Sequence, residues 1–268
     1  MIQSNFQKID SSIEFNVDRD SYQEYRIANQ VMNVIDNLAS SVNTFKPQDL
    51  SLTIYNPLVY ARAPIEEYVK RFFCEEAKVL FLGMNPGPFG MAQTGIPFGD
   101  VVMVKEWMGI NMPVSKPPVE HPKRPVSGFF CTRREVSGSR LWGWAKDKFG
   151  EPENFFKDFF VWNYCPLVFM ESTGANRTPD KLTKEEISLL YFPCDEALRS
   201  LVSILKPKFV IGVGKFAMKR AMIALQEELS KGLVIGDILH PSPASPKANQ
   251  NWAKVIDDQL RFLGCINC

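Results

Sequence analysis

Four short apolar runs, at residues 79–82, 159–164, 209–213 and 233–239, constrain the fold of this chain most strongly. Each run is too short for a typical helix and is rich in large apolar residues, which favours a buried strand. Strands that are apolar on both faces and alternate with helices form parallel sheets covered on both sides. We therefore predict the α/β class, a three-layer α/β/α sandwich around a central, mostly parallel sheet of four strands.

The segments between these runs supply the helices. Apolar residues about one helical turn apart predict a helix over residues 27–38. Five prolines within residues 113–125 predict a long surface loop instead. Without an internal repeat, we expect a single domain over residues 1–268, in which residues 1–20 allow a poorly ordered N-terminal segment. Further helices are expected over residues 64–73, 185–205, 215–229 and 247–262.

The charge balance gives no sign of a polyanionic partner, because the formal net charge is only +1 and nucleic-acid-binding domains are usually strongly basic. A nucleic-acid surface must then be local. The basic residues that could form such a surface either neutralise phosphates or belong to a solvated surface. They are Lys116, Lys123, Arg124, Arg133, Arg134, Arg140, Lys215, Lys219 and Arg220.

No apolar run has the length of a membrane span, so we expect no membrane contact.

The six cysteines occur singly except for Cys265 and Cys268, which form a terminal CxxC pair. A zinc site needs a second such pair or a suitably spaced histidine pair, and neither is present. We therefore expect reduced thiols in an intracellular protein, and neither a metal nor an organic cofactor.

Three polar residues follow predicted strands. Asn85 lies in the loop of residues 83–90, Asn163 lies near the end of the second strand, and His240 follows the fourth. The carboxyl ends of parallel strands meet at one edge of the sheet, where ligands bind, so we expect these side chains to share a site. Two other interpretations stay open, since asparagine also caps turns and a histidine at a strand end also satisfies backbone carbonyls.

The loop of residues 83–90 could also cradle a phosphate. However, it has neither the GK[ST] ending of a P-loop nor the GxGxxG spacing of a dinucleotide-binding loop. An enzyme with a nucleotide cofactor is therefore disfavoured.

Longer motifs carry a resemblance to a known family. The chain closely resembles the single-strand-selective monofunctional uracil-DNA glycosylases, within the uracil-DNA glycosylase superfamily, from about residue 79 to residue 252. The resemblance implies a base excision repair hydrolase that flips uracil or 5-hydroxymethyluracil out of single- or double-stranded DNA. It would cut the N-glycosidic bond and leave an abasic site. The matching segments are residues 83–95, 97–99, 121–125, 135–138, 163, 165–167, 212–214 and 240–243.

The resemblance also implies roles for the two catalytic candidates. Asn85 would position the attacking water, which suits an amide because it can orient water but cannot take its proton. His240 would stabilise the negative charge on the departing base. The other histidine, His121, is expected at the surface or facing a phosphate. A monomer in the nucleus, without cofactor, is the simplest expectation for such an enzyme.

The substrate-binding candidates come from the same family positions. Asn163 would read the hydrogen-bonding edge of the base, and Phe98 would stack on its face. Core packing is the alternative for Phe98. Met84, Gly87 and Met91 would shape the pocket, with Gly87 and Met91 excluding thymine while admitting a polar 5-substituent.

A DNA-binding segment is expected directly after the histidine motif, where the family wedges a loop into the duplex. Its residues here are Pro243, Ala244, Ser245, Pro246 and Lys247. Relatives typically carry a basic residue where this chain has Ala244, so we predict weaker extrusion of bases from duplex DNA, with Lys247 supplying the charge instead.

Two other function classes are left open: a nucleic-acid-binding module without catalysis, and an enzyme acting on free nucleosides. A glycosylase with lyase activity is disfavoured, because that reaction needs an amine nucleophile and Asn85 has none.

Overall fold

The computed structural model describes residues 19–75 and 77–267. Its helices are α1 (Arg19–Asn43), α2 (Pro57–Tyr60), α3 (Arg62–Phe72), α4 (Met91–Thr94), α5 (Val136–Phe149), α6 (Pro152–Phe156), α7 (Lys184–Leu205), α8 (Lys215–Ala224), α9 (Gln226–Ser230) and α10 (Pro246–Phe262). Its strands are β1 (Thr53–Tyr55), β2 (Val79–Gly83), β3 (Phe159–Asn163), β4 (Val168–Met170), β5 (Asn176–Arg177), β6 (Phe209–Val213) and β7 (Val234–Ile238).

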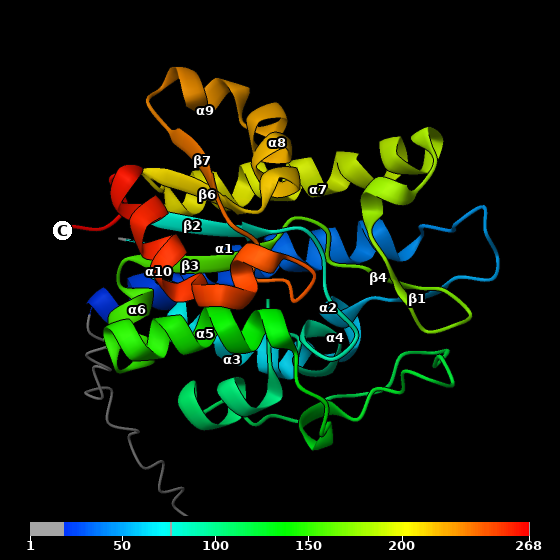
Figure 1. Cartoon of the computed structure of the whole chain (residues 1–268). Coiled ribbons are helices and arrows are strands. Elements are labelled where there is room, and N and C mark those ends of the chain that lie inside the picture. The colour runs from blue at the N-terminus through cyan, green and yellow to red at the C-terminus, as the bar shows by residue number, and fades with distance from the viewer. Residues whose placement is uncertain (1–18, 76, 268) are drawn as a thin grey trace, which may run out of the picture.

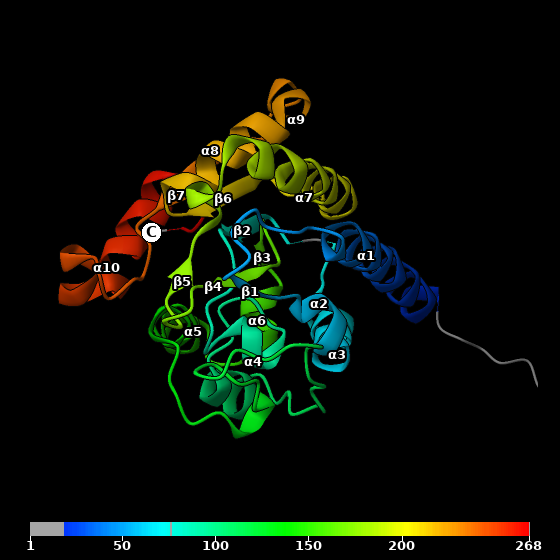
Figure 2. The same ribbon diagram turned by 90° about the vertical axis from the view of Figure 1, so that its right-hand side faces the viewer.

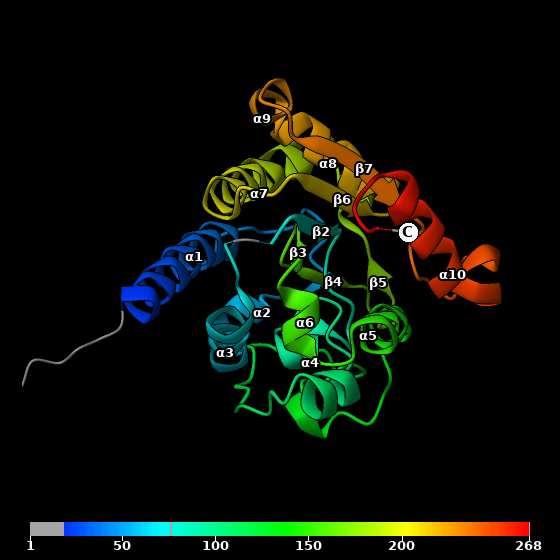
Figure 3. The same cartoon turned by 90° about the vertical axis from the view of Figure 1, so that its left-hand side faces the viewer.

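A four-stranded parallel sheet with the order β3-β2-β6-β7 forms the centre of the molecule. Helices α1, α7 and α8 lie on one side of it, and α5 and α10 lie on the other (Figures 1, 2 and 3). Every residue of β2, β3 and β6 is buried, as expected for strands covered on both faces. The predicted three-layer α/β/α fold is confirmed.

A second, antiparallel sheet with the order β1-β4-β5 was not predicted. Its strands contain only two or three residues, too few for a period-two pattern to be visible in the sequence. Figure 1 shows β1 and β4 beyond the carboxyl ends of the parallel strands. This sheet therefore borders the edge at which the site was expected.

Two of the predicted helices differ from the observed ones. The helix expected over residues 215–229 is broken at Leu225 into α8 and α9. The helix expected over residues 27–38 is longer at both ends, because α1 runs from Arg19 to Asn43. The expected N-terminal segment stays a prediction, because residues 1–18 lie outside the described residues.

The proline-rich loop of residues 113–125 has no helix or strand, as expected, but it is firmly anchored. His121 is only 3% exposed, so its predicted surface or phosphate-facing position was wrong. Its Nε2 lies 3.0 Å from the Glu171 carbonyl, and its Nδ1 accepts a hydrogen bond from the Lys123 amide at 3.1 Å. Both ring nitrogens are therefore used within the fold, which explains a buried histidine without a ligand.

Five of the six cysteines lie in the described part of the chain and are free thiols. None of the described helices is both long and apolar enough to span a membrane. The same residues contain no group of three or more histidine, cysteine or acidic side chains arranged to hold a metal ion.

Candidate functional site

A cavity of about 370 Å³ opens at the carboxyl ends of the parallel strands. Its volume lies within the usual range for small-molecule sites, which begins at roughly 300 Å³. All seven catalytic and substrate-binding residues predicted from the sequence line it: Met84, Asn85, Gly87, Met91, Phe98, Asn163 and His240.

Asn85 follows β2 and is held by its amide nitrogen. Nδ2 donates hydrogen bonds to the carbonyl of Leu167 at 3.2 Å and to that of Pro86 at 3.3 Å. Within the described residues, Oδ1 receives no hydrogen bond from the protein. The backbone ladder between β2 and β3 continues past both strands, because the Cys165 amide donates to the Met84 carbonyl at 2.9 Å. The Asn85 side chain is thus fixed with an acceptor left for a water molecule.

His240 follows β7 and is partly buried beside Phe98, with 6.2 Å between the ring centroids. Burial lowers the pKa of His240 below its ordinary value of 6.5. Its Nδ1 accepts a hydrogen bond from the Ser242 amide at 3.1 Å. A neutral imidazole that accepts at Nδ1 carries its proton on Nε2. The structure therefore favours a neutral histidine that can donate from Nε2.

Asn163 is the last residue of β3 and is 5% exposed. Its Nδ2 donates to the sulfur of Met91 at 3.3 Å, a weak acceptor that a better one can replace. Gly83 lies beside it in the parallel register. A Cβ at Gly83 would overlap Asn163 Oδ1 and would lie 2.8 Å from Phe98 Cε2, so only glycine leaves room for both side chains.

Phe98 is held in a strained backbone conformation, with φ at +54°. Such a conformation costs of order 1–3 kcal/mol in a non-glycine residue and persists only where the surroundings enforce it. The Nε1 group of Trp142 donates to the Phe98 carbonyl at 3.0 Å, and Gly138 lies so close to that carbonyl that a Cβ would overlap it. The ring lines the cavity and also packs partly against the core, so core packing accounts for some of its contacts, while stacking on a base stays a prediction.

The segment after the histidine motif is tied to two helices. Arg140 of α5 donates through Nη1 to the carbonyls of Pro241 at 3.0 Å and Ser242 at 3.4 Å, and through Nη2 to Asn249 Oδ1 at 2.8 Å. Asn249 in turn donates to the Pro243 carbonyl at 2.8 Å. Arg140 is therefore a structural link rather than a free surface cation.

None of the residues of the predicted DNA-binding segment lines the cavity. Ser242, which directly precedes the segment, does line it. Pro243 and Ala244 are exposed, and Ser245 caps α10 by accepting a hydrogen bond from the Ala248 amide. Pro246 and Lys247 form the first turn of that helix and are exposed.

Four further polar residues line the cavity: Glu135, Ser137, Asn176 and Thr178. Glu135 caps α5 by accepting hydrogen bonds from the amides of Ser137 and Gly138, and its burial raises the pKa of the carboxyl group. Glu135 and Ser137 belong to residues 135–138, a segment that resembles the family, so the sequence contains a signal for these two residues. The sequence contains no such signal for Asn176 and Thr178, because the small sheet that brings them to the cavity was not predicted.

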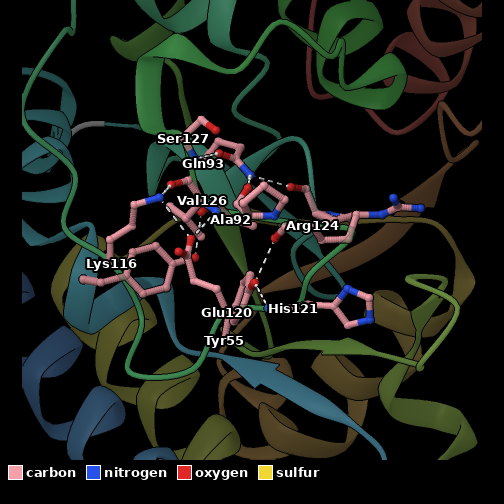
Figure 4. Close-up of polar contacts among 12 residues, drawn as sticks. Tyr55, Ala92, Gln93, Lys116, Glu120, His121, Arg124, Val126 and Ser127 are labelled. Atoms are coloured by element: carbon pink, nitrogen blue, oxygen red, sulfur yellow. Dashed lines mark hydrogen bonds and ion pairs between the residues drawn. The ribbon is translucent and has the colours of Figure 1, made fainter.

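A partly buried network joins the loop of residues 83–90, here called the site loop, to the proline-rich loop of residues 113–125 (Figure 4). The amide nitrogen of Gln93, a residue 1% exposed, donates to the carbonyls of Pro88 at 2.9 Å and Pro125 at 3.1 Å. Its oxygen accepts from the Ser127 amide at 2.8 Å. The hydroxyl of Tyr55, in β1, also anchors the proline-rich loop by donating to the Arg124 carbonyl at 2.8 Å.

Not every basic side chain is available to a polyanion. Lys116 pairs with Glu120 at 3.1 Å, and Arg134 pairs with the buried Asp100 at 2.8 Å. Arg220 pairs with Asp195 in a largely buried position, which rules it out as a surface cation of α8.

Comparisons with known proteins agree with one another. A model of the uracil DNA glycosylase superfamily matches residues 70–261. The single-strand selective monofunctional uracil DNA glycosylase of Bos taurus is 47% identical over 213 residues, covering 80% of this chain and 78% of that protein. The Mus musculus protein of the same name is 46% identical, covering 80% and 76%. The crystal structure of wild-type SMUG2 from Pedobacter heparinus matches with a TM-score of 0.58 at 18% identity, covering 86% of this chain and 97% of that one, which supports the fold alone.

Proposed function

The chain belongs to the uracil DNA glycosylase superfamily, and we propose that it is a monofunctional uracil-DNA glycosylase of base excision repair. It hydrolyses the N-glycosidic bond between uracil and deoxyribose and leaves an abasic site. The observation that carries this proposal is the convergence of Asn85, Phe98, Asn163 and His240 on one cavity large enough for a single base.

The arrangement supports a dissociative hydrolysis. As the bond from C1′ to N1 breaks, its electron pair passes to the base, and negative charge builds up on the uracil oxygens. The Nε2–H of neutral His240 would donate to O2, and a preorganised donor of this kind contributes about 10²–10³-fold. Asn85 Oδ1 would hold the water that adds to C1′, and the proton that this water loses would pass to the departing uracil anion. The sugar is then already cationic in character, so a strong nucleophile is unnecessary.

The remaining candidates would recognise the base. The amide of Asn163 can exchange its weak bond to Met91 sulfur for bonds to uracil N3–H and O4. Phe98 would stack on the ring, worth about 1–3 kcal/mol. Gly87 faces open space at its missing Cβ and lines the cavity, which supports room for a 5-hydroxymethyl group there.

The monofunctional assignment has a chemical basis. A lyase step needs an amine that forms a Schiff base with the sugar. No lysine belongs to the described residues that line the cavity. The abasic site would therefore be released with its strand intact.

DNA is the partner of this enzyme. We propose that the segment from Pro243 to Lys247 enters or abuts the helix from which the base has been extruded, and that the protein works as a monomer in the nucleus. Size-exclusion chromatography with light scattering and imaging of the tagged chain test the last two points.

The central test is cleavage of single-stranded and duplex oligonucleotides that carry one uracil, followed by alkali to break the strand at abasic sites. Wild-type protein should give alkali-dependent product, and Asn85→Ala and His240→Ala should each lose at least about 10²-fold in rate while remaining folded. Borohydride should not trap the protein on the substrate.

Three results would contradict the proposal in whole or in part. Binding to DNA without any product from either substrate would favour the non-catalytic binding module, and release of uracil from free nucleosides but not from DNA would favour the nucleoside enzyme. Efficient borohydride trapping would overturn the monofunctional assignment.

A further inference from the structure

Phe89 is the aromatic residue of the site loop whose side chain does not line the cavity. It is half-buried, and two guanidinium groups lie over its ring. The Cζ atom of Arg133 is 4.6 Å from the ring centroid and that of Arg124 is 5.1 Å from it. The ring attracts each guanidinium, but the two positive charges repel each other. An anion that contacts both would offset this repulsion and stabilise the arrangement.

Neither guanidinium has an anionic partner in the described residues, since no ion pair within 4.0 Å involves Arg124 or Arg133. In addition, Arg124 Nε is buried and makes no hydrogen bond with those residues. Two other cations of these segments, Lys116 and Arg134, differ in this respect because both are paired with carboxylates. Free positive charge is thus concentrated beside the site loop.

The position of Arg124 is fixed by contacts of its backbone and of the adjacent residue. The backbone of Arg124 is held by the Tyr55 hydroxyl, and the adjacent Pro125 carbonyl is held by Gln93, which also holds Pro88 next to Phe89. Figure 4 shows the side chain of Arg124 extending away from this network. On its other side the guanidinium lies against Gly174, where a Cβ would be 3.1 Å from Cζ. A preorganised guanidinium loses less entropy when it binds a ligand.

We propose that Arg124 and Arg133, oriented by the ring of Phe89, form a clamp for a phosphodiester of the DNA strand that carries the flipped nucleotide. The inference rests on the proposed function for the identity of that strand. Planar guanidiniums suit phosphate oxygens because they offer paired donors in a fixed geometry. Since Phe89 belongs to the same short loop as Asn85, a phosphate held here would fix the backbone directly beside the sugar that reacts.

Loss of the clamp should change the salt dependence of DNA affinity, whereas loss of a merely structural residue should not. Each phosphate contact on a single strand contributes about 0.7 to the slope of log affinity against log salt concentration. Because the clamp holds one phosphodiester, losing both arginines should lower the slope by about 0.7, which makes the loss of affinity on going from 50 to 200 mM salt about 2.6-fold smaller. The effect should fall on KM much more than on kcat.

The experiment measures the affinity of the full chain for an undamaged single-stranded oligonucleotide by fluorescence anisotropy across salt concentrations, and then the kinetics on the same strand carrying one uracil. The variants are Arg124→Ala, Arg133→Ala and their double variant, together with Phe89→Leu. The leucine keeps apolar bulk and removes the ring, and should weaken binding about two- to fivefold.

The matched control is Arg71→Ala. Arg71 also lies over a phenylalanine, with 4.8 Å from Cζ to the centroid of Phe72, but it contacts Glu153 and lies at the end of α3, before β2 begins. For Arg71→Ala, the slope of log affinity against log salt concentration should equal that of the wild type.

A slope reduced by about 0.7 in the double variant, with an unchanged control, supports the clamp. A slope within about 0.3 of the wild-type value in the double variant overturns it, even if the wild type releases uracil. If the slope falls but the wild type releases no uracil, the two arginines still bind a DNA phosphate while the proposed glycosylase activity fails, so the two claims are separable.

Discussion

Gly83→Ala tests whether the close packing of Gly83, Asn163 and Phe98 controls activity. Gly83 ends β2 and lies opposite Asn163 in the sheet. The added methyl group would overlap Asn163 Oδ1 and would lie 2.8 and 2.9 Å from two atoms of the Phe98 ring. The backbone of a central parallel strand cannot retreat easily, so the two side chains must move instead.

The expected loss can be estimated from this displacement. A buried amide that no longer meets its partner on the base costs about 1–3 kcal/mol, and a shift of about 1 Å in a reacting group costs roughly 10²-fold. We therefore expect kcat/KM on uracil to fall about 10²-fold. Overpacking of this kind destabilises by about 1–3 kcal/mol, which should lower Tm by only several degrees.

Single-turnover release of uracil from a single-stranded oligonucleotide measures the effect, and thermal unfolding shows that the variant is folded. The control is Gly143→Ala in the middle of α5, where an added Cβ meets no atom within 4 Å. It should keep wild-type kinetics and gain about 0.5–1 kcal/mol of stability. If folded Gly83→Ala releases uracil within about threefold of the wild-type rate, the packing does not control the site.

Four further predictions concern the cavity and the segment after the histidine motif. Because burial lowers the pKa of His240, the neutral form is stable in the fold; activity should persist below pH 6.5, and an acid limb centred above 6.5 in a pH–rate profile would contradict this. The same shift makes this residue contribute stability above pH 6.5 that is lost as the pH falls through the folded-state pKa, so His240→Gln should unfold with a weaker acid dependence. Gly87→Ala should reduce release of 5-hydroxymethyluracil more than release of uracil, because its methyl group enters open space in the cavity; equal losses in competition assays would refute this. Ala244→Arg should raise activity on duplex DNA relative to single-stranded DNA by giving the exposed segment a larger side chain; an unchanged ratio of the two rates would count against the wedge.

The parallel sheet and the residues at its edge could be predicted because their signals are local and strong. Runs such as residues 79–82 are apolar throughout, and a polar residue that follows such a run must lie at the carboxyl end of the sheet. That reasoning needs no knowledge of how the loops fold. It succeeded for Asn85, Asn163 and His240, which all reach the same cavity.

The remaining features depend on contacts between distant segments. His121 is buried because Glu171, from the turn between β4 and β5, supplies a carbonyl for its ring. Composition cannot reveal which cation has a carboxylate beside it, so Arg134 and Arg133 looked alike although only Arg134 meets Asp100. A short strand such as β5 is likewise defined by its partner rather than by its own sequence.

The way in which the loops are anchored has a consequence for salt dependence. Arg140 and Gln93 hold the histidine motif and the site loop mainly through backbone carbonyls, and these bonds join partly buried groups. Salt screens exposed charges far more than buried hydrogen bonds. Raising the ionic strength should therefore weaken contacts of exposed cations such as Arg133 with DNA while the cavity keeps its shape. Affinity for DNA thus depends mainly on exposed cations, whereas catalysis depends on the residues that line the cavity. Salt should therefore raise KM without a matching fall in kcat.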